Sequence, residues 1–358
     1  MKQPYIKGRG AQINPSDPFA SLVRDHRIPI DEIEENVHRL TEIIPVYPKS
    51  IVNKVPSPDV GMEYSLNPYQ GCEHGCVYCY ARNTHPYWGY SAGLDFETKV
   101  MFKKNAPELL SKFLRHPKWE GHPIMLSGNT DCYQPIERKL EITRALLKVF
   151  WEFRHPTGII TKNSLVRRDI DLLKDLSENK LVKVAISLNT LNDTLRQKLE
   201  PRTASVQQRL KTMAFLAKEG VPVMVMIAPV IPGLNDHEIM EIVRTAALMG
   251  VSKAGYIIVR LNGDVAQIFT DWLGKNYKDR AEKVISKITA CHGGQLNDSR
   301  FGTRMKGEGK IAKIIKDQFD LAVRMYLPES KEEQSNHSLY LRRKRPQLDL
   351  FNPDILGS

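Results

Sequence analysis

The feature that most constrains the fold is a regular alternation of apolar runs and amphipathic stretches between residues 61 and 262. The runs are rich in branched aliphatic residues and predict six strands, and the stretches between them carry apolar residues at helical spacing. Short connections between alternating elements favour a parallel sheet with helices outside it. The predicted strands are residues 63–67, 123–126, 158–161, 182–188, 221–228 and 255–261.

Eight such units would close a full barrel, so six units predict an α/β fold in which a partial (β/α)6 barrel of the TIM type stays open. In a parallel barrel the chemistry lies at the carboxyl ends of the strands. We expect Asp236 to cap the helix that precedes the sixth strand. The helices expected around the sheet are residues 107–115, 136–153, 168–179, 206–219 and 236–249.

Composition divides the chain further. The four predicted parts are an N-terminal extension (1–60), a core (61–262), a helical and basic extension (263–327) and a flexible tail (328–358). Helices outside the core are expected at 31–40, 265–273, 279–288 and 310–325. The prolines of the first part are expected to keep the backbone extended up to the first core strand. The simplest role of this part is a wrap or lid packed on the barrel.

The charge balance suits a polyanionic partner. The chain carries 52 Lys and Arg against 41 Asp and Glu, a formal net charge of +11. Basic composition alone is weak support, because many proteins without nucleic-acid partners are basic. No apolar run approaches the roughly 20 residues of a membrane span, and the first residues do not resemble a signal peptide, so we expect a cytoplasmic protein without a membrane partner.

Three of the five cysteines lie in one short loop after the first predicted strand. Cys72, Cys76 and Cys79 are spaced as C-x3-C-x2-C, and Gly71 and Gly75 allow a tight backbone. Three thiolates at this spacing can bind one metal centre. On a [4Fe–4S] cluster they leave one iron open, which suits a catalytic centre.

Two other interpretations of the cysteines remain. A structural zinc site would combine the three thiolates with His74 or His85. A disulfide framework is not expected, because the cysteine count is odd and the cysteine density is low. Of the two cysteines outside the loop, Cys291 is expected to pack in the interior.

The motif has an aromatic residue, Tyr78, before its last cysteine, and it lies within the longer string NPYQGCEHGCVYCYAR. This string resembles the radical S-adenosylmethionine (SAM) superfamily, and within it the DNA-repair-photolyase-like branch related to spore photoproduct lyase. The resemblance implies a [4Fe–4S] cluster whose open iron chelates SAM. It also implies reductive cleavage of SAM to a 5′-deoxyadenosyl radical that abstracts hydrogen from a substrate, with a donor such as flavodoxin or ferredoxin supplying the electron.

With this resemblance, polar residues at the predicted strand ends become candidates for binding SAM. Lys162 is suited to the SAM carboxylate, and Tyr78 is expected near the adenine, with residues 229–235 under that base. Each candidate could instead cap a helix or end a loop, Asp131 and Ser187 most of all. The candidate set is Tyr78, Ser127, Gly128, Asn129, Asp131, Lys162, Ser187 and Asn189.

Cys132 is a candidate hydrogen donor. Spore photoproduct lyase uses an extra cysteine near the end of this strand to donate hydrogen to a product radical. Here Gly128 and Asn129 occupy the matching part of the loop, and Cys132 lies a few residues later. The alternative is a small, half-buried loop residue.

Four cations are candidates for contacting substrate. Arg202 could bind a phosphate bidentately, or pair with Glu200 or another acid. Basic residues interleaved with an aromatic side chain suit a nucleic-acid backbone, and the loop before the last helix has this composition. The loop candidates are Arg300, Arg304 and Lys306. Lysines further along are explained equally well by a solvated helix face.

The tail contains a short motif of its own. The segment 347–351 is similar to the peptide that binds the bacterial sliding clamp, and it consists of Gln347, Leu348, Asp349, Leu350 and Phe351. This similarity would connect the chain with replication or repair in a bacterium. The same apolar residues could instead dock on the barrel.

The leading hypothesis for the whole chain is a radical SAM enzyme acting on DNA, for lesion repair or processing. The alternatives are radical SAM modification of RNA, peptide or a small molecule, and a non-enzymatic, metal-stabilised DNA-binding adaptor of the clamp.

Overall fold

The main sheet is an open, nearly all-parallel barrel wall, seen in a computed structural model that describes residues 6–15, 41–328 and 336–340. Its strand order is β10-β9-β8-β7-β6-β3-β2, so six parallel strands follow the chain order and β2 adds an antiparallel edge. The edge strands β10 and β2 do not pair with each other, which confirms the partial barrel. The strands are β2 (Val52–Lys54), β3 (Tyr64–Leu66), β6 (Ile124–Leu126), β7 (Thr157–Thr161), β8 (Val182–Ser187), β9 (Val223–Val230) and β10 (Lys253–Ile258).

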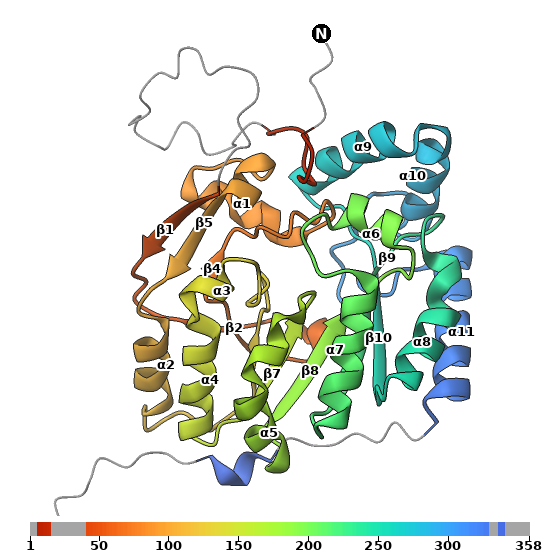
Figure 1. Ribbon diagram of the computed structural model, residues 1–358. Helices are drawn as coiled ribbons and strands as arrows, with labels where there is room; N and C mark the ends of the chain where they lie inside the picture. The colour runs from red at the N-terminus through yellow and green to blue at the C-terminus, as the bar shows by residue number, and fades with distance from the viewer. Residues whose placement is uncertain (1–5, 16–40, 329–335, 341–358) are drawn as a thin grey trace, which may run out of the picture.

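Helices cover the outside of this sheet (Figure 1). Each turns an apolar stripe inward, as in α4, where Leu146, Leu147 and Phe150 are fully buried. These stripes meet the strands in one continuous core. The outer helices are α2 (Ala106–Leu114), α4 (Ile142–Glu152), α5 (Ile170–Glu178), α7 (Val206–Lys218), α8 (Ile239–Leu248) and α11 (Gly309–Tyr326), and 3-10 turns are η2 (Pro58–Val60), η3 (Tyr80–Thr84), η4 (Pro86–Trp88), η5 (Ser164–Asp169), η6 (Asp236–Glu238) and η7 (Lys278–Arg280).

The single helix predicted at residues 136–153 is wrong. It divides into α3 (Glu137–Leu140) and α4, because Glu141 adopts a left-handed backbone with φ of 52°. The break lets the buried Glu137 carboxylate accept the backbone N–H of Thr143 at 3.1 Å, at the start of the second helix. Arg168 donates to the same carboxylate at 2.7 Å.

A second, three-stranded sheet was not predicted. In it β1 (Glu42–Val46) pairs in parallel with β5 (Lys99–Lys103), and β5 pairs antiparallel with β4 (Tyr69–Gln70). The short helix α1 (Leu94–Thr98) leads into β5. Strand β1 belongs to this second sheet and β2 to the main sheet. The predicted N-terminal extension (1–60) therefore contributes strands to the fold from residue 42 onward. The other predicted boundaries of the four parts stay predictions.

Two local predictions around β8 and β9 are also corrected. Asp236 does not cap a helix: it begins η6, and its carboxylate accepts the backbone N–H of Gly233 at 2.8 Å. After β8 the chain forms an unpredicted helix, α6 (Asp193–Leu199), whose N-cap is the Asn192 side chain. The predicted strand at 221–228 is displaced two residues toward the carboxyl end.

The C-terminal helices α9 (Asp264–Asn276), α10 (Ala281–Ala290) and α11 confirm the helices expected there. Helix α9 lies at the end of the barrel that carries the cysteine loop (Figure 1). Its Trp272 is fully buried and donates to the Lys198 carbonyl at 2.9 Å. In this way the helix shares a core cluster with Cys76 and Val77.

Part of the predicted tail docks on the barrel. After the 3-10 turn η8 (His337–Leu339), the Tyr340 hydroxyl donates to the carbonyl of Leu114, and its ring lies 5.1 Å from that of His155. The helix expected at 31–40 and the clamp-binding-like motif at 347–351 lie outside the described residues. In the part of the chain that is described, no helix is both long and apolar enough to cross a membrane.

Candidate active site

The cysteine loop runs from β4 to η3, and its backbone N–H groups donate to two backbone carbonyls and one side chain from three separate segments. Cys72 donates its N–H to Phe96 at 2.9 Å, and Val77 donates to Leu199 at 3.1 Å. Gln134 accepts the N–H of Glu73 at 2.9 Å. Gly75 needs its φ of 68°, and a Cβ there would also lie 2.8 Å from the Glu97 carboxylate. The loop conformation is therefore set by its surroundings.

A buried ion pair between Arg82 and Glu97 holds the backbone of the cysteine loop. Arg82 and Glu97 are both fully buried, and the guanidinium also donates to the carbonyl of Cys76 at 2.9 Å. The Glu97 carboxylate accepts the backbone N–H groups of Gly10 and Ala11 at 3.1 and 2.7 Å. The described N-terminal segment thus packs on the cysteine loop, and neither partner of the ion pair was predicted.

One cavity of about 590 Å³ collects most of the predicted site residues. It opens at the carboxyl ends of the strands, as a parallel barrel predicts. Pro229, near the end of β9, lies in its wall, whereas residues 230–235 of the expected adenine shelf do not line it. The predicted residues that line it are Cys72, Cys76, Tyr78, Cys79, Ser127, Gly128, Asn129, Asp131, Lys162, Ser187, Arg304 and Lys306.

The environment of the thiols fits a cationic cluster. Cys72 and Cys76 are each 7% exposed. Burial raises the pKa of both thiols, and the carboxylates of Asp131 and Glu200 add to the effect. Because a thiol must be deprotonated to bind metal, iron binding would supply the positive charge that keeps these buried groups as thiolates.

Of the histidines in the zinc interpretation, His74 has polar neighbours, whereas both ring nitrogens of His85 are buried without a hydrogen-bond partner among the described residues. His74 lies with Nδ1 3.4 Å from the Asp131 carboxylate and Nε2 3.3 Å from the Asn163 amide. His85 is fully buried, with its ring 5.4 Å from Phe96. Among the residues that the structure describes, no group of three or more His, Cys, Asp and Glu is arranged around a single metal ion. This arrangement does not support a structural zinc site.

Asp131 organises the strand ends. Its carboxylate accepts hydrogen bonds from Thr161 Oγ1, the Lys162 N–H and the Tyr133 N–H, each at 2.8 Å. Burial would raise its pKa, but His74 and these hydrogen bonds together hold the pKa at about 2. The carboxylate is therefore charged and fully engaged by protein groups, which leaves it little capacity for a ligand.

Lys162 presents a charge to the cavity. Burial lowers the pKa of its ammonium, but the acidic groups of Cys76 and Glu200 outweigh burial and raise the pKa. Across the described residues, no hydrogen bond or ion pair of this ammonium is recorded. A charged group in this position is suited to an anionic ligand group such as a carboxylate.

Tyr78 is held by a network that was not predicted. Its hydroxyl donates to the buried Glu200 carboxylate, which also pairs with the buried guanidinium of Arg209. Arg209 donates in turn to the carbonyl of Ser187 at 2.9 Å. The network connects the cysteine loop with the end of β8. The sequence suggests Glu200 only as a partner of Arg202. It does not reveal Arg209 or Tyr78 as partners, because spacing along the chain does not show which buried side chains meet.

The structure does not bring four predicted residues into this cavity. Cys132 is fully buried, with its N–H bonded to Ser127 Oγ at 2.6 Å, and it does not line the cavity. Asn189 is 1% exposed and lies outside the lining as well. Both of its side-chain amide atoms are buried without a hydrogen-bond partner among the described residues.

The other two are arginines that form ion pairs. Arg202 pairs with Glu73 at 3.2 Å, which is the second of the two roles considered for it. Arg300 pairs with Asp298 at 2.8 Å and with Glu308 at 2.6 Å. Both guanidinium groups are therefore paired with acids of the protein.

Residues 296–307, here called the strap, bridge the two open edges of the barrel. On the β10 side, Ile258 donates its N–H to Met305 at 3.0 Å. On the β2 side, Asp59 in η2 accepts the N–H of Gly302 at 2.8 Å and the Arg304 guanidinium at 2.5 Å. The strap thereby carries Arg304 and Lys306 into the cavity wall.

An open parallel barrel with a three-cysteine loop at its catalytic end defines a radical-generating iron–sulfur enzyme. The family model of the radical SAM superfamily matches residues 66–246, and the chain belongs to that superfamily. Members of this superfamily use a [4Fe–4S] cluster and SAM, which are the cofactors expected from the sequence. When bound, the cluster supplies the electron that cleaves SAM to a 5′-deoxyadenosyl radical.

Several relatives match much of the chain. An uncharacterized protein of Methanocaldococcus jannaschii is 32% identical over 252 residues, which cover 70% of this chain and 88% of the relative. An uncharacterized protein of Mycobacterium tuberculosis is 32% identical over 237 residues, covering 64% and 69%. A radical SAM Nα-GlyT isomerase of Pseudomonas phage M6 is 30% identical over 172 residues, covering 48% and 34%.

Among solved structures, spore photoproduct lyase complexed with dinucleoside spore photoproduct has a TM-score of 0.58 to this chain. The match covers 80% of each chain at 16% identity. The likeness therefore shows a common fold that extends beyond the barrel.

Proposed function

We propose that this protein is a radical SAM enzyme that abstracts hydrogen from nucleic acid, and from DNA in particular, in lesion repair or processing. The observation that carries the proposal is the lining of the cavity. The three cysteines share one cavity with Arg260, Arg304 and Lys306, so a polyanion could lie within reach of the radical. A neutral small molecule would not require three cations there.

Two relationships bear on the substrate. The fold is shared with spore photoproduct lyase, solved in complex with a dinucleoside photoproduct, which supports a nucleic-acid substrate. The phage relative is named as a radical SAM isomerase, which supports radical SAM chemistry but not a substrate class. Neither determines the reaction of this chain, so lyase-like chemistry on DNA is part of the proposal.

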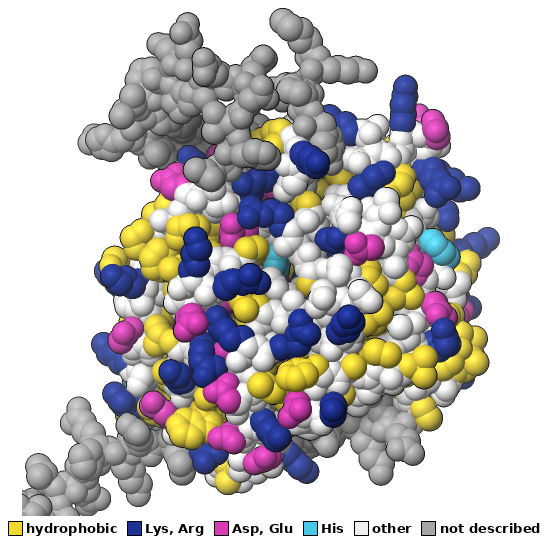
Figure 2. All heavy atoms as spheres, viewed as in Figure 1, with side chains coloured by type: hydrophobic (Ala, Val, Ile, Leu, Met, Phe, Trp, Pro, Cys, Tyr) yellow, Lys and Arg dark blue, Asp and Glu magenta, His cyan; other side chains and the backbone are white. Residues whose placement is uncertain are grey.

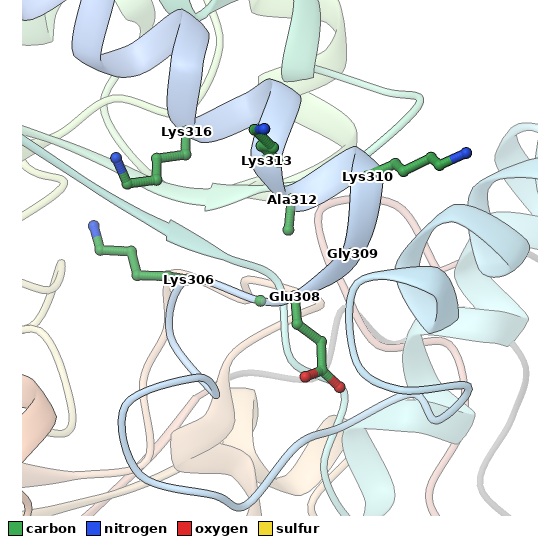
Figure 3. Close-up of a pocket in the computed structure, with 8 residues that line it drawn as sticks. Lys306, Glu308, Gly309, Lys310, Ala312, Lys313 and Lys316 are labelled. Atoms are coloured by element: carbon green, nitrogen blue, oxygen red, sulfur yellow. The ribbon is translucent and has the colours of Figure 1, made fainter.

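The overall positive charge does not locate the substrate. Figure 2 shows lysine and arginine side chains spread over the face in view, with acidic side chains among them. A second hollow of about 510 Å³ lies at the start of α11 and is lined by lysines. Figure 3 shows Lys310 extending away from Lys306 and Lys316, and Lys316 is paired with Asp320. Lys306 lines this hollow as well as the cavity, but no cysteine lines the hollow.

In the proposed assignment, Cys72, Cys76 and Cys79 bind the cluster, and Lys162 binds the SAM carboxylate. Tyr78, Ser127, Gly128, Asn129 and Ser187 complete the SAM site, since all of them line the same cavity. The remaining contacts proposed are with an electron donor such as flavodoxin or ferredoxin, and with the sliding clamp through residues 347–351. The cytoplasm, which is reducing, is the proposed compartment.

The test is deuterium transfer. Anaerobically reconstituted protein, SAM and a reductant are incubated with deuterium-labelled DNA, RNA or peptide, and the deoxyadenosine formed is analysed for deuterium. Label arriving from DNA alone supports the proposal. Label from RNA or peptide alone would replace DNA as the substrate class, and an absence of SAM cleavage would favour the adaptor alternative. Deleting residues 347–351 should abolish clamp capture and leave SAM cleavage intact.

A further inference from the structure

Arg260 is a cavity residue that the sequence did not single out. It follows β10, lines the cavity that contains the cysteines, and is half-buried. Within the described parts of the chain, no hydrogen bond or ion pair of its guanidinium is recorded. Guanidinium groups in a partly buried position usually have hydrogen-bonding partners, because leaving a charge both desolvated and unpaired is costly.

The charges around Arg260 do not neutralise it. Burial lowers its pKa, and the guanidinium of Arg304 lowers it further, whereas Tyr80, Asp59 and Asp298 act in the opposite direction. Two positive side chains are therefore close enough to repel each other in one cavity. Asp59 already pairs with Arg304, and a bound anion would supply a partner for Arg260.

The nearby carboxylates are already engaged. Asp59 accepts the Arg304 guanidinium at 2.5 Å and the Gly302 N–H at 2.8 Å. Asp298 accepts the guanidinium of Arg300 at 2.8 Å and the hydroxyl of Thr303 at 2.9 Å. Each of these acids is thus held by the strap itself, and neither is recorded as bonded to Arg260.

The third cation is fixed by the protein. Lys306 donates to the carbonyl of Tyr256 at 2.9 Å, and its ammonium lies 3.6 Å from the centre of that ring. Arg304 is likewise fixed by Asp59 and by the hydroxyl of Ser57. Of the three cations, Arg260 is then the one whose charged group has no recorded hydrogen bond or ion pair with the described residues, whereas the other two are held in place by protein groups.

We propose that Arg260, which lines the cavity together with Arg304 and Lys306, binds a phosphodiester group of the substrate. This inference rests on the proposed function, because it identifies the charged group through which nucleic acid is held. The planar guanidinium donates two parallel hydrogen bonds, a geometry that matches two phosphate oxygens. The site uses the strap side of the cavity and is separate from Lys162, which serves the SAM carboxylate.

The binding experiment compares two dinucleotides on the full chain, anaerobically reconstituted and loaded with SAM. One is a thymidine dinucleotide with its single phosphodiester, and the other is the neutral methylphosphonate form of the same dinucleotide. Equilibrium dialysis gives both dissociation constants. We expect the charged form to bind about 10- to 100-fold more tightly to the unaltered protein, as for a hydrogen bond to a charged group.

Two substitutions of Arg260 connect the preference with the residue. In Arg260→Gln the two dinucleotides should bind equally, and in Arg260→Lys part of the preference should remain. The matched control is Arg244→Gln on α8, where the guanidinium pairs with Glu241 outside the cavity, and it should keep the full preference. Iron content and the circular dichroism spectrum report whether each variant is folded.

Several results would overturn the assignment. Equal binding of the two dinucleotides by the unaltered protein, or binding of neither, excludes a phosphodiester site. An unchanged preference in Arg260→Gln excludes this residue. Competition by inorganic phosphate as strong as that by the dinucleotide assigns the site to free phosphate. A parallel loss of SAM affinity in Arg260→Gln assigns the residue to the SAM site. Deuterium transfer from long DNA remains a separate measurement, so failure here is distinguishable from failure of the proposed function.

Discussion

The guanidinium of Arg82 lies 2.6 Å from the carboxylate of Glu97, and neither side chain is exposed to solvent. The pair joins the carbonyl of Cys76, the helix before β5 and the described N-terminal segment. Two buried charges are costly to desolvate and are compensated only when every partner is present. The conformation of the cysteine loop therefore depends on contacts far away in the sequence.

Glu97→Ala should lower the free energy of unfolding by about 3–5 kcal/mol, because Arg82 would be left buried without its partner. Iron bound per chain after reconstitution should fall as well, since the carbonyl of Cys76 loses a fixed donor. Urea denaturation and iron analysis measure the two effects. Glu241→Ala, which removes an exposed pair with Arg244, is the control and should change neither. Normal stability in Glu97→Ala would contradict the structural role.

Replacing any one of Cys72, Cys76 and Cys79 by Ala should remove both the iron–sulfur absorption and SAM cleavage, because each thiolate binds one iron of the cluster. Absorption spectra and deoxyadenosine formation are the measurements. Cys291→Ala is the matched control, since this cysteine is fully buried at the end of α10 and away from the cavity. SAM cleavage retained in Cys76→Ala would refute the ligand assignment.

Lys162→Met should weaken SAM binding by about 10- to 100-fold, the size of one hydrogen bond to a charged group. The cluster absorption should stay, because the three thiolates are unchanged. Equilibrium dialysis with labelled SAM measures the affinity. Lys218→Met, on the exposed side of α7, serves as the control. An unaltered SAM affinity in Lys162→Met would mean that another residue binds the carboxylate.

Stability should decrease as the pH falls from about 6.5 to about 4. Burial lowers the pKa of His85 to about 4, so within this window the unfolded chain binds a proton that the folded chain excludes. The full effect is at most about 3 kcal/mol. Urea denaturation at pH values of about 4.5 and about 6, which both lie within this window, measures the slope. His85→Phe should flatten it, and an equal slope in the variant would assign the effect to other groups.

Asp59→Asn should loosen the strap, because a neutral amide cannot form the ion pair with Arg304. In the unaltered protein Asp59 accepts the backbone N–H of Gly302. In Asp59→Asn we expect this N–H, and the other backbone N–H groups of the strap, to exchange hydrogen severalfold faster. Hydrogen exchange read by mass spectrometry makes the comparison. Glu308→Gln, which removes an exposed partner of Arg300, should have a smaller effect on this peptide. Equal exchange in both variants would show that Asp59 does not hold the strap.

Much of the core was predictable because its signals are local. The six parallel strands have apolar runs that mark them, and the three cysteines have a spacing that marks a metal loop. The second sheet had no comparable signal. Its strands β1 and β4 are short or interrupted by proline, and they are strands only because β5 lies between them. The break at Glu141 likewise follows from a buried carboxylate that no local pattern reveals.

The sequence by itself determined the class of chemistry, since the spacing of three cysteines in one short loop marks a metal-binding loop. It also determined the barrel, since alternating apolar runs must be buried in a parallel sheet. Only the tertiary structure decided which charges meet. Arg202 and Arg300 are neutralised by acids, whereas Arg260 and Lys162 are left facing the cavity without a recorded partner in the described chain. Electrostatic pairing depends on distances of a few ångströms between segments remote in sequence, and folding alone sets those distances.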